Sequence, residues 1–309
     1  MRRRQSISGE WPSDRDIATI LKKTAGLFIV ASVIVRFVDS PYASPQERLK
    51  LIVDMPDSTI YEGKSGIDIV YHQILSASFG DADEHDPDFL GQLHLVVGSI
   101  VLALKPLPRA SLAEILQMTP EKIWHILTHL HSVLIVPESA SDPIRILHKS
   151  FADFITDQQR CPDGKYLINS LIHNSGLGVR CLELMQMKLT KNICHLPPYA
   201  MNNDFEDLPA CRERYIGSPL SYACSSWSKQ LQLSPEVRDH TSTIIKLVHD
   251  FLTQHLLSWL EILSLEDIFD VAIYSLRDLR SWLINVSIFC RYYCSALVHS
   301  RSRVRLKPY

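Results

Sequence analysis

Apolar residues recur at spacings of three and four along most of the chain, the pattern of helices that bury one face. The longest such stretches are residues 17–38, 89–104, 167–189, 215–231, 244–265 and 268–297. Residues 27–38 are apolar almost without interruption, so we expect this helix to be enclosed on most sides. Ser40-Pro41 ends it, because a proline disfavours the helical conformation in the residue before it. The pattern predicts a mainly α-helical protein.

Residues 105–157 carry shorter and more sharply bounded patterns. Ser111 and Glu114 have the spacing of a capping box, in which the two side chains satisfy backbone N–H groups at a helix start. This predicts a helix that begins at Ser111 and stops at Met118. Thr119-Pro120 then supplies a cap and a first-turn proline for a second helix.

A hairpin is expected after these two helices. Residues 133–136 and 144–147 are short β-branched runs, and a polar stretch between Pro137 and Pro143 separates them. Two tightly connected helices followed by a hairpin are typical of a winged helix-turn-helix. We therefore expect a helical bundle with a central winged helix-turn-helix and a short β-hairpin, followed by an α-helical linker domain.

The clearest domain boundary is the acidic turn at residues 81–88. We divide the chain into a helical region at residues 1–88, a winged helix at residues 89–160 and a helical, linker-like domain at residues 161–309. Within the last of these, Gly176 and Gly178 are expected to weaken the middle of the first helix, because glycine is a poor helix former.

Composition is that of an ordinary folded protein. The chain has 309 residues, of which 46% are hydrophobic and 21% charged, with a net charge of −2. Its seven cysteines are odd in number and scattered, which indicates free thiols in a reducing compartment, so we expect a cytoplasmic protein. The apolar runs at residues 25–35 and 93–104 fall short of the roughly 20 residues that a membrane-spanning helix needs. No membrane association is expected.

A winged helix often binds DNA through its second helix. Here the exposed face of that helix is expected to carry Glu121, Lys122, His125, Thr128 and His129. Residues 105–160 contain six basic and six acidic side chains, whereas DNA affinity depends mainly on positive groups at the phosphates. The sequence therefore disfavours nucleic acid as a partner.

Motifs for catalysis or metal binding are weak. Gly63-Lys64-Ser65 matches the end of a phosphate-binding loop, but it lacks the earlier glycine and the preceding strand that such a loop requires. His125 and His129 are four residues apart, yet no glutamate follows the first histidine as in a zinc protease. The pattern G-x-S-x-G of a nucleophile elbow is absent. We expect no enzymatic activity and no metal site.

Several stretches resemble one known family when taken together and in order. They are residues 25–31 (AGLFIVA), 131–137 (HSVLIVP), 144–154 (IRILHKSFADF), 180–185 (RCLELM), 191–194 (KNIC), 220–224 (LSYAC) and 257–265 (LSWLEILSL). The chain resembles the post-ATPase helical, winged-helix and linker regions of NACHT-type signalling ATPases of the STAND, or NLR-like, class, above all those expanded in mushroom-forming fungi. The resemblance covers residues 11–297.

The resemblance implies a nucleotide switch that ADP holds closed and that opens on exchange for ATP. In this family a winged-helix histidine contacts the β-phosphate of ADP, and His148 stands at that position. An imidazole donor beside a helix start favours an anion. The alternative is that His148 only caps the helix that follows it. Phe28 replaces the proline of a Gly-Leu-Pro adenine contact, which makes it the weaker candidate for the adenine side.

The family's Walker A loop and C-terminal repeats have no counterpart in this sequence. The resemblance therefore implies a non-catalytic regulatory and interaction fragment, with protein partners and an oligomer as one possibility. It would hold no cofactor on its own, and ADP or ATP only when paired with a NACHT core. The alternatives are a helical adaptor that binds a partner protein without nucleotide and, third, a winged-helix DNA-binding protein.

Overall fold

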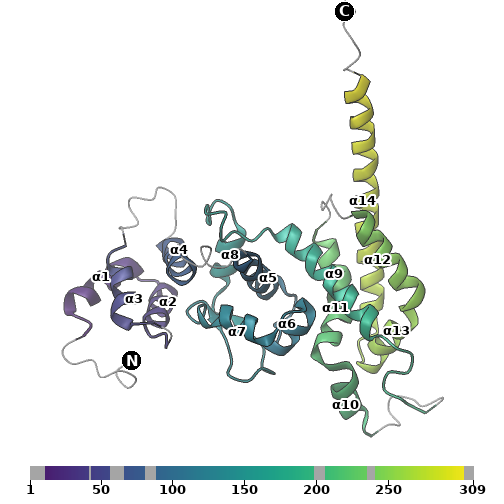
Figure 1. Ribbon diagram of the computed structural model, residues 1–309, viewed down its shortest axis with the longest axis horizontal. Helices are drawn as coiled ribbons and strands as arrows, with labels where there is room; N and C mark the ends of the chain where they lie inside the picture. Colours follow the sequence, from purple (N-terminus) through teal and green to yellow (C-terminus); the bar gives the residue numbers. More distant parts are fainter. Residues whose placement is uncertain are drawn as a thin grey trace, which may run out of the picture. The chain divides into compact units, whose positions relative to one another are not determined.

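The computed structural model describes residues 11–41, 43–55, 66–80, 88–197, 206–234 and 241–302, with the backbone alone for residues 241, 242 and 287–302. The chain forms two compact units, one of residues 1–113 and 117–169 and one of residues 114–116 and 170–309. The described part is mainly α-helical with a single two-stranded antiparallel sheet, as the sequence predicts (Figure 1). The division into three domains stays a prediction.

Four helices open the first unit. They are α1 (Asp14–Thr24), α2 (Phe28–Val38), α3 (Pro45–Val53) and α4 (Gly66–Phe79). The single helix predicted for residues 17–38 is wrong: Ala25 and Gly26 adopt left-handed backbone angles, with φ of 48° and 76°. A left-handed residue cannot continue a right-handed helix, so α1 ends there and α2 starts in a new direction.

The expectation that residues 27–38 are enclosed on most sides is also wrong. Val33 and Phe37 are fully buried, but Phe28 is 86% exposed and Val35 is 50% exposed. One face of α2 therefore packs in the core, and a continuous apolar run is no proof that both faces are covered.

The second part of the first unit contains the predicted helix pair and hairpin. Its elements are α5 (Phe89–Leu102), α6 (Arg109–Leu116), α7 (Pro120–Thr128), β1 (Leu134–Ile135), β2 (Arg145–Ile146) and α8 (Lys149–Thr156). Leu134 pairs with Ile146, and Ile135 with Arg145. Just before α6, Pro108 bridges Pro143, so the chain ahead of α6 also pairs with the hairpin. This order of elements is that of a winged helix-turn-helix.

The two predicted helix starts in this region have different outcomes. The cap at Thr119 is confirmed, since its side chain accepts a bond from the Lys122 N–H and Pro120 occupies the first turn. The cap at Ser111 is wrong, because α6 already begins at Arg109. Ser111 therefore lies inside the helix, where it is only 3% exposed. The pairing of Pro108 with Pro143 fixes the chain direction two residues earlier than the capping signal does.

Contacts between the opening helices and the winged helix fix the surroundings of the candidate site. Arg36 of α2 donates from Nε to the carbonyl of His131 at 3.0 Å. The Ser78 hydroxyl of α4 donates to the carbonyl of His129 at 3.3 Å. These bonds satisfy carbonyl groups just after α7, which lack partners within the helix.

The second unit is entirely helical in the part of the chain that is described. It contains α9 (Ser170–Lys188), α10 (Leu208–Cys211), a π-helical turn (Arg212–Ile216), α11 (Gly217–Gln232), α12 (Thr241–Gln254), α13 (Leu256–Leu265) and α14 (Asp270–Ser302). Figure 1 shows α14 continuing past the ends of the other helices of this unit. Within the described residues, no helix combines the length and the apolar character needed to span a membrane.

The long helix predicted for residues 244–265 is in fact two helices that meet at His255. The break accompanies an aromatic cluster: the Trp227 ring lies 5.1 Å from Phe251 and 6.0 Å from Trp259, centroid to centroid. The Trp259 indole N–H also donates to the Cys224 carbonyl at 2.9 Å. The aromatic cluster thus spans the break, with Phe251 on α12 and Trp259 on α13.

Candidate functional site

His148 is the N-cap of α8, as the second of the two sequence interpretations proposes. Its backbone is extended, and Nδ1 accepts a hydrogen bond from the Ser150 N–H at 3.2 Å. A ring nitrogen that accepts a bond carries no proton, so the neutral imidazole has its proton on Nε2. Because the side chain is exposed, this Nε2–H can donate to an external acceptor. Capping and phosphate contact are therefore compatible roles that use different ring nitrogens.

A chain of hydrogen bonds leads from His148 into the core. The Ser150 hydroxyl lies 2.8 Å from His148 Nδ1 and 2.8 Å from the Tyr71 hydroxyl. Tyr71 is fully buried, and its ring packs against Phe151 and Phe154 at 5.3 and 5.4 Å. Burial raises the pKa of Tyr71, so its hydroxyl stays protonated and can donate towards Ser150. The imidazole is thus oriented by a buried group on α4.

The same side of α4 forms a buried ion pair. Arg160 binds Asp68 through two nitrogens, with Nη2 at 2.6 Å and Nε at 3.2 Å from Oδ1. The Asp68 side chain is 4% exposed and the Arg160 side chain 28%. The bonds to Asp68 raise the pKa of Arg160. The pair ties the chain after α8 to α4. Since Ser150 at the start of α8 is also bonded to α4 through Tyr71, both ends of α8 are held against α4.

Phe28, the other predicted site residue, is the first residue of α2 and is 86% exposed. Neither Phe28 nor His148 lines the groove described next. Gly63-Lys64-Ser65 lies outside the described residues.

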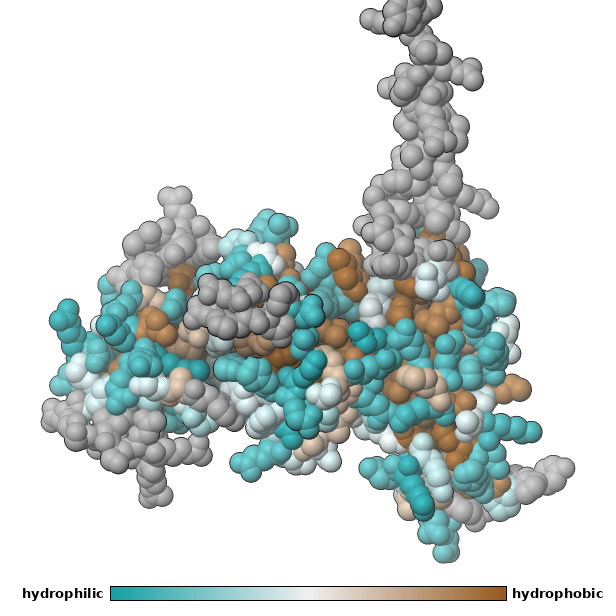
Figure 2. Space-filling model, in the orientation of Figure 1, coloured by the Kyte–Doolittle hydropathy of each residue, from teal (hydrophilic) through white to brown (hydrophobic). Residues whose placement is uncertain are grey.

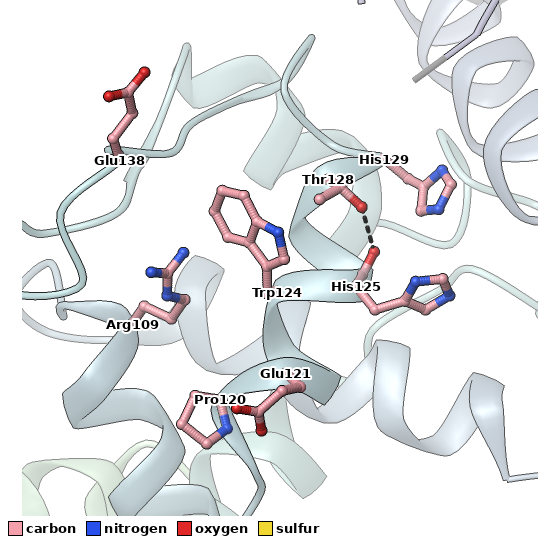
Figure 3. A pocket seen from close by; sticks show the side chains of 8 residues that line it. All are labelled: Arg109, Pro120, Glu121, Trp124, His125, Thr128, His129 and Glu138. Atoms are coloured by element: carbon pink, nitrogen blue, oxygen red, sulfur yellow. Dashed lines mark hydrogen bonds between the residues drawn. The ribbon is translucent and has the colours of Figure 1, made fainter. Parts of the chain in front are cut away.

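An open groove of about 870 Å³ runs along α7. Six of its lining residues come from α7 and its C-cap, namely Pro120, Glu121, Trp124, His125, Thr128 and His129. Arg109 of α6 and Glu138, from the loop between β1 and β2, complete it. Figure 3 shows Trp124 in the middle of these residues, with Arg109 on one side and His125 on the other.

Trp124 is held in place by two neighbours. The Arg109 guanidinium carbon lies 4.3 Å from the centre of the indole ring, a cation–π contact. The ring of His131 meets the indole edge-on, with centroids 6.3 Å apart and planes at 80°. The Thr128 hydroxyl is directed back to its own helix, where it donates to the His125 carbonyl at 2.7 Å.

The two histidines of the groove touch each other. The rings of His125 and His129 are 5.4 Å apart, and His129 also packs against Phe79 at 5.7 Å. Burial lowers the pKa of His129, and the charges of His125 and Arg48 lower it further. His129 is therefore neutral at pH 7. Among the described residues, no group of three or more His, Cys, Asp or Glu side chains could hold a metal ion.

Sequence reasoning finds only part of this groove. It predicts one exposed helix face of Glu121, Lys122, His125, Thr128 and His129. All but Lys122 line the groove, but the exposure predicted for Thr128 is wrong, since this side chain is buried, and His129 is half-buried. It misses Trp124, because helical spacing alone does not mark a half-buried tryptophan as a groove residue. It also misses Arg109 and Glu138, which join the residues of α7 only through the tertiary fold.

Comparisons with known proteins give no further guide. No protein-family model, no curated protein and no solved structure matches this chain.

Proposed function

We propose that the chain is a non-catalytic regulatory module of a NACHT-type signalling switch in the cytosol. In this role it binds a NACHT nucleotide-binding core, and His148 contributes a donor to the β-phosphate of ADP held by that core. The chain itself neither hydrolyses ATP nor holds nucleotide alone. Its partners are proteins rather than nucleic acids.

The observation that supports this proposal is the state of His148. Nδ1 is occupied by the cap, the proton is placed on Nε2, and the ring is exposed at the start of a helix. The backbone N–H groups of a helix N-terminus favour an anion, so an added imidazole donor and the helix act in the same direction.

The test is association of the full chain with a separately produced NACHT nucleotide-binding domain loaded with ADP. His148→Ser keeps a capping oxygen but removes the ring donor. We expect this variant to bind about tenfold more weakly, the effect of losing one hydrogen bond to a charged group. Unchanged affinity of His148→Ser would show that the histidine is only a cap.

A nucleotide-independent adaptor is the second candidate, and the surface of the second unit favours it. Leu257 is 80% exposed, Ile273 67% and Phe269 53%. Figure 2 shows hydrophobic residues at the surface of this unit. Exposed apolar side chains offer contact area to a protein partner. An adaptor would bind its partner equally well with ADP, with ATP or with no nucleotide.

A further inference from the structure

The groove along α7 has the features of a preorganised binding surface. Trp124 is fixed between Arg109, at 4.3 Å, and His131, at 6.3 Å. A side chain that is already ordered loses little conformational freedom when a partner binds. Tryptophan is also among the residues that contribute most to binding energy at protein interfaces.

The walls of the groove are fixed as well. The Ala110 N–H at the start of α6 donates to the Ala140 carbonyl at 3.2 Å, which ties the β1–β2 loop to α6. Pro108 and Pro143 are bridged in the same place. Arg109 and Glu138 are therefore carried by segments that are bonded to each other, and the Arg109 guanidinium lies against the indole.

The fixed charges of the groove are mainly negative. Glu121 and Glu138 are exposed, and neither forms an ion pair with any residue that the structure describes. The positive charge of Arg109 is stacked on Trp124. With His129 neutral at pH 7, the fixed charges among the lining residues are two carboxylates and one guanidinium. This excess of one negative charge favours a cationic over an anionic segment.

We propose that this groove binds a basic segment of a partner protein, with Lys or Arg side chains paired to Glu121 and Glu138 and an apolar side chain against Trp124. The site is distinct from His148, which does not line the groove. The inference thus goes beyond the proposed contact with nucleotide: the second helix of this winged helix serves as a protein-binding rather than a DNA-binding surface.

The test uses the full chain and two fluorescein-labelled peptides, one alternating arginine with leucine and one alternating glutamate with leucine. Fluorescence anisotropy should show binding of the arginine peptide alone, and added salt should weaken it. In the double variant Glu121→Gln with Glu138→Gln we expect about a fivefold loss of affinity, the combined effect of two exposed ion pairs. Trp124→Phe should lower affinity while keeping an aromatic ring.

A matched control removes the same charge elsewhere. Glu206→Gln with Asp207→Asn changes two exposed acidic residues outside the groove and should leave the affinity unchanged. Equal binding of both peptides, or equal losses in the two double variants, would overturn the proposal, since either result means non-specific attraction. Direct binding of a fluorescein-labelled mixed-sequence DNA duplex to the chain, weakened in Trp124→Phe, would overturn it in favour of nucleic acid.

Discussion

At the scale of single residues, His148 and Asp68 show how polar groups define the region around α8. His148 caps the helix through Nδ1, and its position is supported by Ser150 and the buried Tyr71. Asp68 lies 3% exposed on α4 and holds Arg160 beyond the end of α8. Each role makes a separate prediction for stability.

Removing the cap should destabilise the protein without affecting its core. We expect His148→Ala to lower the free energy of unfolding by about 1 kcal/mol, because the Ser150 N–H loses its acceptor. His148→Ser should stay within a few tenths of a kcal/mol of the unmodified chain, since serine is itself a good cap. Urea unfolding followed by circular dichroism measures both, and equal stability of the two variants would contradict the capping role.

Breaking the buried ion pair should have a larger effect. Asp68→Asn keeps the shape of the side chain but leaves Arg160 without its carboxylate, and we expect a loss of about 2 kcal/mol. The control is Asp163→Asn, in the exposed pair with His72 at 3.6 Å, for which a loss of less than about 1 kcal/mol is expected. The same urea titration compares them, and similar losses would mean that burial of Asp68 adds nothing.

At the scale of elements, the close packing of α9 on α11 depends on Gly178. Gly176 and Gly178 are expected from the sequence to weaken α9, but that expectation considers helix propensity alone and not packing. A Cβ added at Gly178 would lie 2.9 Å from Leu231 Cδ2 and 3.2 Å from the Trp227 carbonyl oxygen. At Gly176 no atom lies within 4 Å of an added Cβ. One glycine is thus required by the packing, and the other is not.

These two positions predict opposite effects of the same substitution. Gly178→Ala should destabilise the second unit by about 1–3 kcal/mol through overpacking. Gly176→Ala should stabilise it by about 0.5–1 kcal/mol through better helix propensity. Thermal unfolding of the full chain gives the two shifts, and a stabilising Gly178→Ala would mean that α9 and α11 are not in close contact.

The stability of the protein should depend on pH through His129 and His131, which lie at and just after the end of α7. Burial lowers the pKa of His129 and of His131 from the ordinary value of 6.5, with further lowering by His125 and Arg48 for the first and by Arg36 for the second. The unfolded chain therefore takes up protons that the folded chain does not, and stability falls as pH decreases through 6.5 towards the folded-state pKa values. Above pH 6.5 both states keep these histidines neutral, so no stability is lost through them.

Urea titrations from neutral to mildly acidic pH measure this loss. The double variant His129→Gln with His131→Gln should lose stability less steeply with acid over the same window. An unchanged pH slope in the double variant would show that these two histidines are not the groups responsible.

At the scale of the whole molecule, the sequence predicts the features that depend on neighbouring residues. Thr119-Pro120 starts α7, and the β-branched runs pair as a hairpin, because caps and strand propensity act locally. The break at Ala25-Gly26 is missed although a glycine just past a helix end is a local stop signal, whereas the break at His255 has no such signal. The groove is only half predicted, because Arg109 from α6 and Glu138 from the β1–β2 loop join the residues of α7 through the tertiary fold.

The proposed regulatory role unites these observations, because His148 presents a donor to a nucleotide-binding core while the α7 groove is left for a protein segment. Its central claim is that the chain distinguishes the nucleotide state of that core. The most direct measurement is the affinity of the full chain for a NACHT nucleotide-binding domain loaded in turn with ADP and with a non-hydrolysable ATP analogue. The account predicts tighter binding of the ADP form, with the difference reduced in His148→Ser. Equal affinity for the two forms, or no association with either, would contradict it.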